Sequence, residues 1–316
     1  MLAGELATGG LRTFVVRESD GQVTATLSRE LTPRAISPDG TRIAYFMAPA
    51  YDELWLADTA DLDHPRRLLS ISPRFTGGLV WSTDGNGILF TSHTRERVPG
   101  VESAPLEARL EGLHLDTDLR ESFAERSEIS LRPLLWAREQ RVVAAVGGFG
   151  QKGPGDYLVV DRGAAKTSSL PDATRNDVTV AWPQASSDAR WVSALVRYGT
   201  TRTVLRVWPS EDLGRAIDVE PAGRQIRSTL WRPGTSELAV DVDGTLEVWA
   251  RDGTNRRQIA DLAGNWLHAF RWDGTAIYAG REGGRPGIVD LIEIGTGRRV
   301  PLPAAIETVW GSVRLP

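Results

Sequence analysis

Short runs of β-branched and aromatic residues alternate with polar turns along most of this chain. Residues 35–46 combine an Ala-Ile pair, the turn sequence Ser-Pro-Asp-Gly and the run Ile-Ala-Tyr-Phe, which predicts a strand, a tight turn and a second strand. Residues 80–90 repeat this arrangement, with Ser-Thr-Asp-Gly in the turn. The pattern predicts an all-β protein built from repeated hairpins.

The hairpin pattern recurs at a nearly constant interval. Equivalent apolar positions are separated by 45, 55, 46, 49, 39 and 40 residues, with a mean of about 46, which is typical of a four-stranded propeller blade. A third strand follows in each of six copies, for example at residues 54–58 and 246–249, and a shorter fourth strand follows in several. The equivalent positions are Ile36, Trp81, Trp136, Trp182, Trp231, Phe270 and Trp310.

The two ends of the chain complement each other. Residues 11–16 and 22–27 have the pattern of third and fourth strands, whereas residues 307–310 have the pattern of a first strand. We therefore expect residues 1–30 and 303–316 to form a closing blade, which hides the edges of an open set of blades. The prediction is one β-propeller domain over residues 1–316, with seven four-stranded blades; six or eight are the alternatives. The other repeats start near residues 31, 77, 131, 177, 226 and 265.

The first repeat resembles a known group. Its residues 37–45, Ser-Pro-Asp-Gly-Thr-Arg-Ile-Ala-Tyr, followed by Glu-Leu-Trp-Leu-Ala-Asp at 53–58, look like the TolB-like, WD-type β-propeller repeat of bacterial proteins. The match is fair in the second copy and degenerate in the others. This resemblance implies a propeller that serves as a protein-interaction platform, a periplasmic assembly component or an accessory domain of a peptidase.

Composition narrows the classes of function. The absence of cysteine excludes disulfides and thiolate chemistry, and four histidines leave little material for a metal centre. Lys152 and Lys166 are the two lysines, so arginine makes up the rest of the 37 basic residues. Since these are dispersed and the net charge is -4, we expect no nucleic-acid partner.

The hydropathy of the chain indicates whether it inserts into a membrane. The chain has no apolar run of about 18 residues and no export signal at its start, so we expect no membrane insertion by the chain as given. The resemblance favours an extracytoplasmic location, in the periplasm or at the cell surface, over the cytoplasm. The sequence leaves open whether the domain comes from a larger protein.

Motifs for chemistry are weak, and we expect no catalytic residue, no cofactor and no metal. Residues 148–153 match G-x-G-x-x-G, but a predicted strand rather than a helix follows, which favours an inter-strand loop. No G-x-S-x-G elbow occurs. Residues 116–118 and 241–244 hold paired aspartates that are better explained as turn caps than as Ca²⁺ ligands, and the histidines lack metal-ligand spacing.

Most of the eleven tryptophans fall at equivalent repeat positions, which predicts packing between blades. Trp266 is the exception, and we expect it in a connecting segment, where it could contact a partner.

Loop lengths suggest a binding surface. Alternate connections of an up-and-down blade lie on opposite faces, which places the short Asp-Gly turns on one face. The expected insertions, 92–112, 147–156, 198–203 and 280–287, and the charged link 116–130 then share the other face. The expected partner-binding residues are Arg95, Arg97, Arg109, Arg120, Arg126, Lys152, Arg202, Trp266 and Arg285.

These patterns favour a non-catalytic scaffold for protein–protein interaction, monomeric and part of a bacterial envelope or multi-domain assembly. A small-molecule or glycan sensor that uses the central channel is the alternative, followed by an enzyme with its site at the channel mouth.

Overall fold

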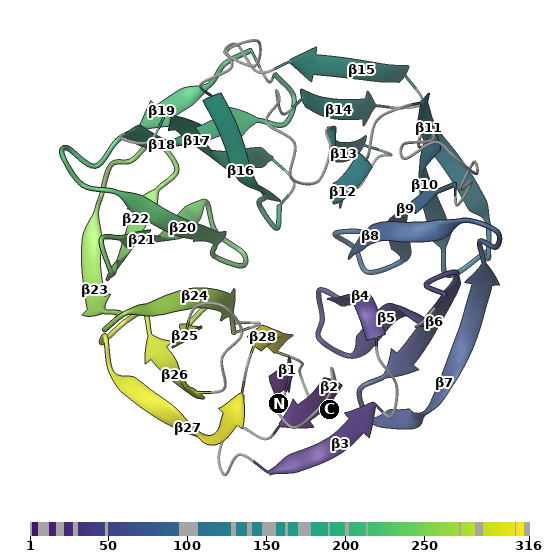
Figure 1. The fold of residues 1–316 in the computed structure, drawn as a ribbon, viewed down its shortest axis with the longest axis horizontal. Coiled ribbons are helices and arrows are strands. Elements are labelled where there is room, and N and C mark those ends of the chain that lie inside the picture. The colour runs from purple at the N-terminus through teal and green to yellow at the C-terminus, as the bar shows by residue number, and fades with distance from the viewer. Residues whose placement is uncertain are drawn as a thin grey trace, which may run out of the picture.

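The computed structural model is an all-β propeller, with its sheets arranged in a ring around a central axis (Figure 1). Its described part contains no helix that is long and apolar enough to span a membrane. The structure describes residues 2–5, 13–16, 22–27, 31–47, 50–94, 107–127, 131–137, 141–146, 156–161, 164–169, 178–188, 190–199, 202–212, 214–271, 273–281, 287–306 and 308–312.

The described residues form seven four-stranded antiparallel sheets, which we number in chain order. Sheet 1 contains β4 (Leu31–Ile36), β5 (Arg42–Met47), β6 (Glu53–Asp58) and β7 (Asp61–Ser70). Sheet 2 contains β8 (Phe75–Trp81), β9 (Gly87–His93), β10 (Glu107–His114) and β11 (Arg120–Ser127). Sheet 3 contains β12 (Leu131–Ala137), β13 (Arg141–Val146), β14 (Asp156–Asp161) and β15 (Ala164–Ser169).

The second half of the chain follows the same plan. Sheet 4 contains β16 (Val178–Ala185), β17 (Trp191–Tyr198), β18 (Arg202–Pro209) and β19 (Ile217–Val219). Sheet 5 contains β20 (Ile226–Trp231), β21 (Glu237–Val242), β22 (Thr245–Ala250) and β23 (Arg257–Asp261). Sheet 6 contains β24 (Asn265–Phe270), β25 (Ala276–Arg281), β26 (Gly287–Glu293) and β27 (Arg299–Ile306).

The closing sheet joins the two ends of the chain. It contains β28 (Thr308–Ser312), β1 (Leu2–Glu5), β2 (Thr13–Val16) and β3 (Val23–Leu27) in that order. Leu2 pairs with Ser312 and Glu5 pairs with Thr308. In every sheet the first strand lies nearest the axis and the fourth lies at the rim (Figure 1).

Each innermost strand contains a β-bulge that the sequence pattern did not reveal. In sheet 5, Ile226 pairs with Val242 but Ser228 pairs with Asp241, so Arg227 is an extra residue on the inner strand. Equivalent shifts interrupt the inner strands of the other six described sheets. A bulge bends a strand and turns one side chain away from the regular alternation.

The hydrophobic core lies between neighbouring sheets rather than in one centre. Trp136 of β12 packs among Leu89, Leu110 and Leu131, which joins sheets 2 and 3. The predicted packing role of the tryptophans at repeat positions is confirmed for the five whose side chains are described and buried. These are Trp81, Trp136, Trp208, Trp231 and Trp249.

The turns between first and second strands are held by a repeated Ser/Asp arrangement. In sheet 2 the Ser82 hydroxyl donates to Asp84 Oδ1 at 2.7 Å and accepts from the Gly87 N–H at 2.8 Å. Sheets 1 and 4 repeat it with Ser37–Asp39 and Ser186–Asp188. The turn aspartates of these repeats therefore satisfy backbone and hydroxyl donors, as turn chemistry requires.

Several boundaries predicted from sequence were wrong. The charged segment 116–130 is not a link between sheets, because residues 120–127 form the rim strand β11. The predicted insertion 92–112 contains the end of β9 and most of β10, and the connection between β17 and β18 is limited to residues 199–201. The second strand of the closing sheet, β1, was not anticipated.

Candidate functional site

Two faces of the ring can be distinguished from the strand order. We call the face with the first-to-second turns, such as 82–86, the turn face, and the face where second strands end and third strands begin the loop face. Three of the predicted binding residues lie at the loop-face ends of strands: Arg109 in β10, Arg202 in β18 and Trp266 in β24. They belong to sheets 2, 4 and 6, so they do not form one patch.

Two other placements differ from the prediction. Arg120 lies at the turn-face end of β11, because the turn before it is beside the 82–87 turn, with the Leu115 N–H donating to the Asn86 carbonyl at 2.8 Å. Trp266 is not in a connecting segment but is the second residue of the inner strand β24. The backbone of Arg126 lies in β11, with its side chain outside the described part, and Arg95, Arg97, Lys152 and Arg285 lie outside the described residues altogether.

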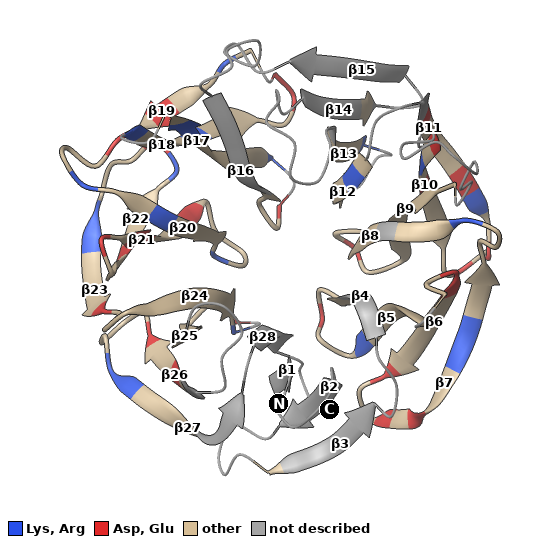
Figure 2. Ribbon diagram, viewed as in Figure 1, with Lys and Arg blue, Asp and Glu red and all other residues tan. Residues whose placement is uncertain are grey.

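The charged groups of the described residues are distributed around the ring with both signs interspersed (Figure 2). Arg202 and Arg120 are also bound to neighbouring side chains within the protein. Arg202 donates to Glu220 at 2.6 Å and its guanidinium lies 4.8 Å from the centre of the Tyr198 ring. Arg120 donates to the buried Glu111 at 2.9 Å. The described members of the predicted set are therefore separated around the ring and paired with neighbours, and their role in binding a partner stays a prediction.

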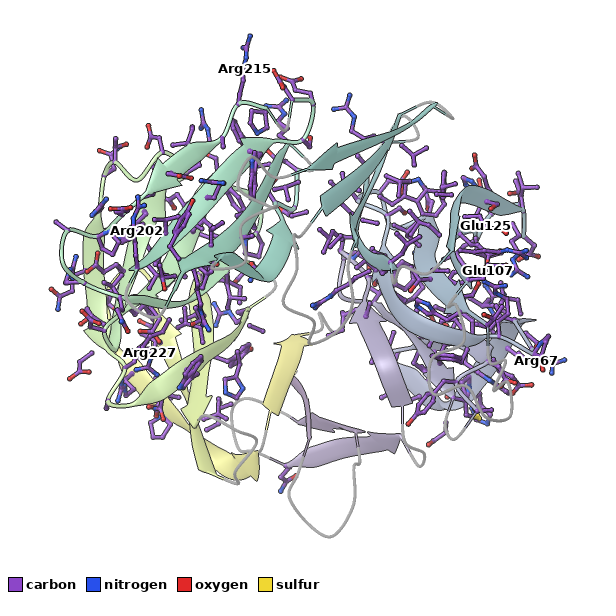
Figure 3. The ribbon with its side chains drawn as sticks, turned by 45° about the horizontal axis from the view of Figure 1, so that its top comes forward. Arg67, Glu107, Glu125, Arg202, Arg215 and Arg227 are labelled. Atoms are coloured by element: carbon purple, nitrogen blue, oxygen red, sulfur yellow. The ribbon has the colours of Figure 1, made fainter. Side chains whose placement is uncertain are left out.

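The loop-face end of sheet 2 carries an ordered charged group, which we call the sheet 2 strip: Glu107, Arg109 and Glu125. Arg109 lies 3.0 Å from Glu107 and 2.9 Å from Glu125. Figure 3 shows Glu107 and Glu125 close together, on the opposite side of the ring from Arg202 and Arg227. The strip is half-exposed, so its charges remain available to a partner.

A mostly buried arginine, Arg74, is hydrogen-bonded to the sheet 2 strip. Arg74 donates to the Glu107 carboxylate at 2.7 Å, to the Glu107 carbonyl at 2.7 Å and to the Ser92 hydroxyl at 3.0 Å. The hydrogen bond from Arg74 is the main reason that the pKa of Glu107 is lowered. The hydrogen bond to Glu125 likewise raises the pKa of Arg109. Both charges are therefore fixed at neutral pH.

The interior behind this strip is polar as well. The buried Glu111 carboxylate accepts from the Ser92 hydroxyl at 2.7 Å and from Arg120. His93 is also buried, its Nδ1 has no hydrogen-bond partner in the described part of the chain, and burial followed by the charge of Arg74 lowers its pKa. Of these groups, Arg120 was singled out from the sequence, whereas Glu111, Ser92 and His93 were not predicted as site residues, because their contacts come from separate strands.

A second cluster lies where sheets 5 and 6 meet, also at the loop-face end. The guanidinium of Arg227, the bulged residue of β20, lies 4.7 Å from the centre of the Trp266 ring. Its Nε lies 3.4 Å from Oδ2 of the fully buried Asp241. Trp266 was predicted as a contact residue, whereas Arg227 was missed because the bulge cannot be read from the local pattern.

The structure accounts for the aspartates of residues 241–244, which could have suggested Ca²⁺. Asp241 Oδ1 accepts from the Gly244 N–H at 2.9 Å, and Asp243 and Gly244 have φ of 50° and 84°, as in a tight hairpin turn. Within the described ranges, no three His, Asp or Glu side chains are grouped so that they could hold a metal ion. The G-x-G-x-x-G segment at 148–153 lies outside those ranges.

Comparisons with solved structures show the fold of this chain. No protein-family model and no curated protein matches the sequence. The crystal structure of TolB from Acinetobacter baumannii is 14% identical with a TM-score of 0.55, and the match covers 98% of this chain and 64% of TolB. The Swd1 β-propeller domain of Myceliophteria thermophila is 14% identical, with a TM-score of 0.57 and coverage of 89% and 88%.

Peptidases that contain a propeller are similar as well. An acylaminoacyl peptidase in complex with Z-Gly-Gly-Phe-chloromethyl ketone is 14% identical, with a TM-score of 0.65, and the match covers 94% of this chain and 49% of that one. The chain thus spans about half the length of the peptidases and less than two thirds of TolB. The chain has the β-propeller fold of TolB-like and WD-type proteins, as its repeat indicated.

Proposed function

We propose that this protein is a non-catalytic propeller scaffold that binds a protein partner over the loop-face end of sheet 2. The observation that carries the proposal is the sheet 2 strip, in which Arg74 and Arg109 hold two carboxylates in fixed positions at a half-exposed surface. Groups that are already ordered lose little conformational entropy when a partner binds. Exposed ion pairs contribute little to stability, which leaves binding as a better reason for their arrangement.

Burial raises the pKa of Asp241, but the other described carboxylates with a shifted pKa have a lowered one, which supports a binding role over a catalytic one. Although burial acts to raise the pKa of Asp39, hydrogen bonds from Ser37 and Thr41 outweigh it and lower that pKa. Asp273 behaves in the same way in its own turn, with Arg271 and Thr275. These groups stay ionised and structural, whereas a general acid at neutral pH needs a raised pKa.

We further propose that the seven sheets are the blades of one closed ring, and that the protein works as a monomer outside the cytoplasm in a bacterial envelope assembly. The pairing of β28 with β1 supports closure of the ring. The fold similarity to TolB supports the extracytoplasmic setting. The similarity to a propeller in a mitotic checkpoint complex, with a TM-score of 0.54, is in line with a protein partner.

A second candidate is the propeller domain of a hydrolase assembly. Fold similarity to the acylaminoacyl peptidases, with TM-scores of 0.63 to 0.65, is higher than to TolB. In that case the hydrolase domain lies on another chain or on a longer form of this one.

The scaffold proposal can be tested by affinity capture from extracts of the native organism. Deleting the whole of residues 92–112 would remove most of β10, so the variant has to keep that strand. Thr94 and Glu107 face each other, with the Thr94 N–H donating to the Glu107 carbonyl at 3.1 Å. Replacing residues 95–106 with Asn-Gly should therefore close a two-residue hairpin without disturbing the sheet.

Wild type, the Asn-Gly variant and Arg109→Glu would be compared, with Arg298→Glu as the matched control. Arg298 is also exposed and paired with a glutamate, Glu293 at 3.1 Å, but on the turn face. We expect the partner to be lost with Arg109→Glu, the Asn-Gly variant or both, and retained with Arg298→Glu. If both loop-face variants still capture the partner, the proposed location of the binding surface is wrong. If the wild type captures no partner, the proposed scaffold function is wrong.

A further inference from the structure

The cluster between sheets 5 and 6 has features that packing alone does not explain. The bulge at Arg227 turns this side chain out of the regular alternation of β20, and the Trp266 ring of the next sheet covers one side of its guanidinium at 4.7 Å. About a quarter of the Arg227 side chain stays exposed, at 26%. Figure 3 shows Arg227 on the side of the ring opposite the sheet 2 strip.

Asp241 lies beside the Nε edge of this guanidinium. Its side chain is fully buried and faces sheet 6, since its strand neighbour Ala239 packs in the core shared with Leu267. Oδ1 accepts from the Gly244 N–H, and Oδ2 lies 3.4 Å from Arg227 Nε. Because a guanidinium has a rigid fork, a carboxylate at the Nε edge fixes the orientation of the two terminal nitrogens.

Some polar atoms of this cluster have no hydrogen bond to the rest of the described chain. Arg227 makes no hydrogen bond to any described residue, and Ser228 Oγ and Asp241 Oδ2 are buried without one in the same set. Ser228 lies directly opposite Asp241 in the ladder and so projects from the same side of the sheet. Ser228 Oγ and Asp241 Oδ2 are therefore two buried atoms in one place without a hydrogen bond, although Asp241 Oδ2 is ion-paired with Arg227, and such atoms indicate a bound water, ion or ligand.

Other arginine–aromatic pairs of the chain show what a structural role looks like. Arg42 lies over Trp81 and donates to the Gly85 carbonyl of the next sheet at 2.8 Å. Arg256 lies over Trp249 and donates to the Gly253 and Glu220 carbonyls. Both arginines tie segments together, whereas Arg227 has the stacked ring and the supporting carboxylate but no such carbonyl.

We propose that Arg227, stacked on Trp266 and oriented by Asp241, binds a carboxylate at the loop-face boundary of sheets 5 and 6. A carboxylate presents two coplanar oxygens that match the two terminal guanidinium nitrogens. A phosphate carries more negative charge than a carboxylate and would be repelled more strongly by Asp241, which favours the singly charged group. This site does not depend on the sheet 2 strip, so the two proposals can fail separately.

The carboxylate can belong to a free organic acid or to an acidic side chain of a partner, and one titration can separate these sources. The protein would be labelled with ¹⁵N-arginine, and the Nε–H resonances of Arg227 and Arg251 assigned from their loss in Arg227→Lys and Arg251→Lys. Arg251 is the matched control, since its guanidinium lies 4.4 Å from the Trp191 ring centre but at a turn-face loop. The probes are propionate, the acetylated and amidated tripeptide Gly-Glu-Gly, and their amide analogues propionamide and Gly-Gln-Gly.

We expect a saturable shift of the Arg227 resonance with the acids, with a dissociation constant on the order of 1–10 mM for propionate, and none with the amides. Arg251 should not show a saturable shift. Similar affinity for both acids supports a small organic acid, and about tenfold tighter binding of the peptide supports a partner side chain.

One variant makes the result specific. Trp266→Leu should weaken acid binding severalfold while it keeps the resonance pattern of a folded protein. Absence of a saturable shift at Arg227 with either acid, or equal shifts with the amides or at Arg251, would overturn the proposal.

Discussion

The indole ring of Trp136 lies directly on Gly87 of the neighbouring sheet. A Cβ added to Gly87 would lie 2.5 Å from Trp136 Cζ3, and one added to Gly112 would lie 2.8 Å from Trp136 Cη2. The rings of His114 and Phe123 also pack against the Trp136 ring, with their centres 4.8 and 5.5 Å from its centre. The boundary between sheets 2 and 3 thus depends on two glycines whose missing side chains make room for one tryptophan.

Gly87→Ala should therefore destabilise the protein by about 2 kcal/mol, because the new methyl group meets a ring that is enclosed on all sides. The free energy of unfolding from denaturant titration measures this. Adding Trp136→Leu should recover part of the loss, since the smaller side chain makes room. Gly295→Ala is the control, with nothing within 4 Å of its added Cβ, and should change stability by less than about 0.5 kcal/mol. Equal effects at the two glycines would contradict the steric explanation.

The buried carboxylate of Glu111 should matter more than the exposed ion pairs. Glu111→Leu leaves the Ser92 hydroxyl and the Arg120 guanidinium without their acceptor, which should lower the free energy of unfolding by about 2 kcal/mol. Glu293→Leu also removes an arginine partner, Arg298, but from the surface, and should have no measurable effect on stability. If the two substitutions cost the same, the polar network behind the sheet 2 strip is not stabilising.

His93 should make stability sensitive to mild acid. Its folded pKa is below the ordinary value of 6.5 because of burial and the nearby Arg74, so the unfolded chain binds the proton more readily. Stability is then complete above pH 6.5 and declines as the pH falls below that value. Thermal unfolding between pH 8 and pH 5 should show this decline in wild type and a smaller one in His93→Phe.

His64 provides the matched control for that titration. It is exposed, and its pKa is raised by a hydrogen bond to Asp61, so any contribution to stability is present below pH 6.5 and lost as the pH rises. This is the opposite direction, and His64→Gln should leave the loss of stability in acid intact. An acid-induced loss that persists in His93→Phe would show that another group is responsible.

Stronger acid should titrate the turn aspartates. The pKa of Asp273 is lowered from 3.8. Burial acts to raise this pKa, but hydrogen bonds from Arg271 and Thr275 outweigh the effect of burial. Its contribution is therefore present above pH 3.8 and is lost as the pH falls through the folded value. The melting temperature of Asp273→Asn should be lower than that of wild type at pH 6, and the two should converge as the pH approaches 3. Parallel curves would mean that Asp273 is not stabilised in its ionised form.

The sequence by itself determined the strand-forming repeats, because turns such as Ser82-Thr-Asp-Gly85 and the strands beside them depend on local backbone preferences. It also indicated that the repeated tryptophans pack between sheets. Local preferences are present in any short segment, which is why the all-β propeller could be predicted without a structure.

Only the tertiary structure decided where the charged residues lie. Residues 120–127 have no strong alternation of apolar and polar positions. Among residues 120–125 of the rim strand β11, Ala124 is buried and Phe123 is partly buried. The position of residues 120–127 in a strand depends on pairing with β10. Arg227 meets Trp266 and Asp241 through a bulge and a sheet boundary, which join residues up to 39 positions apart. Contacts of this kind arise when sheets pack, and no local pattern encodes them.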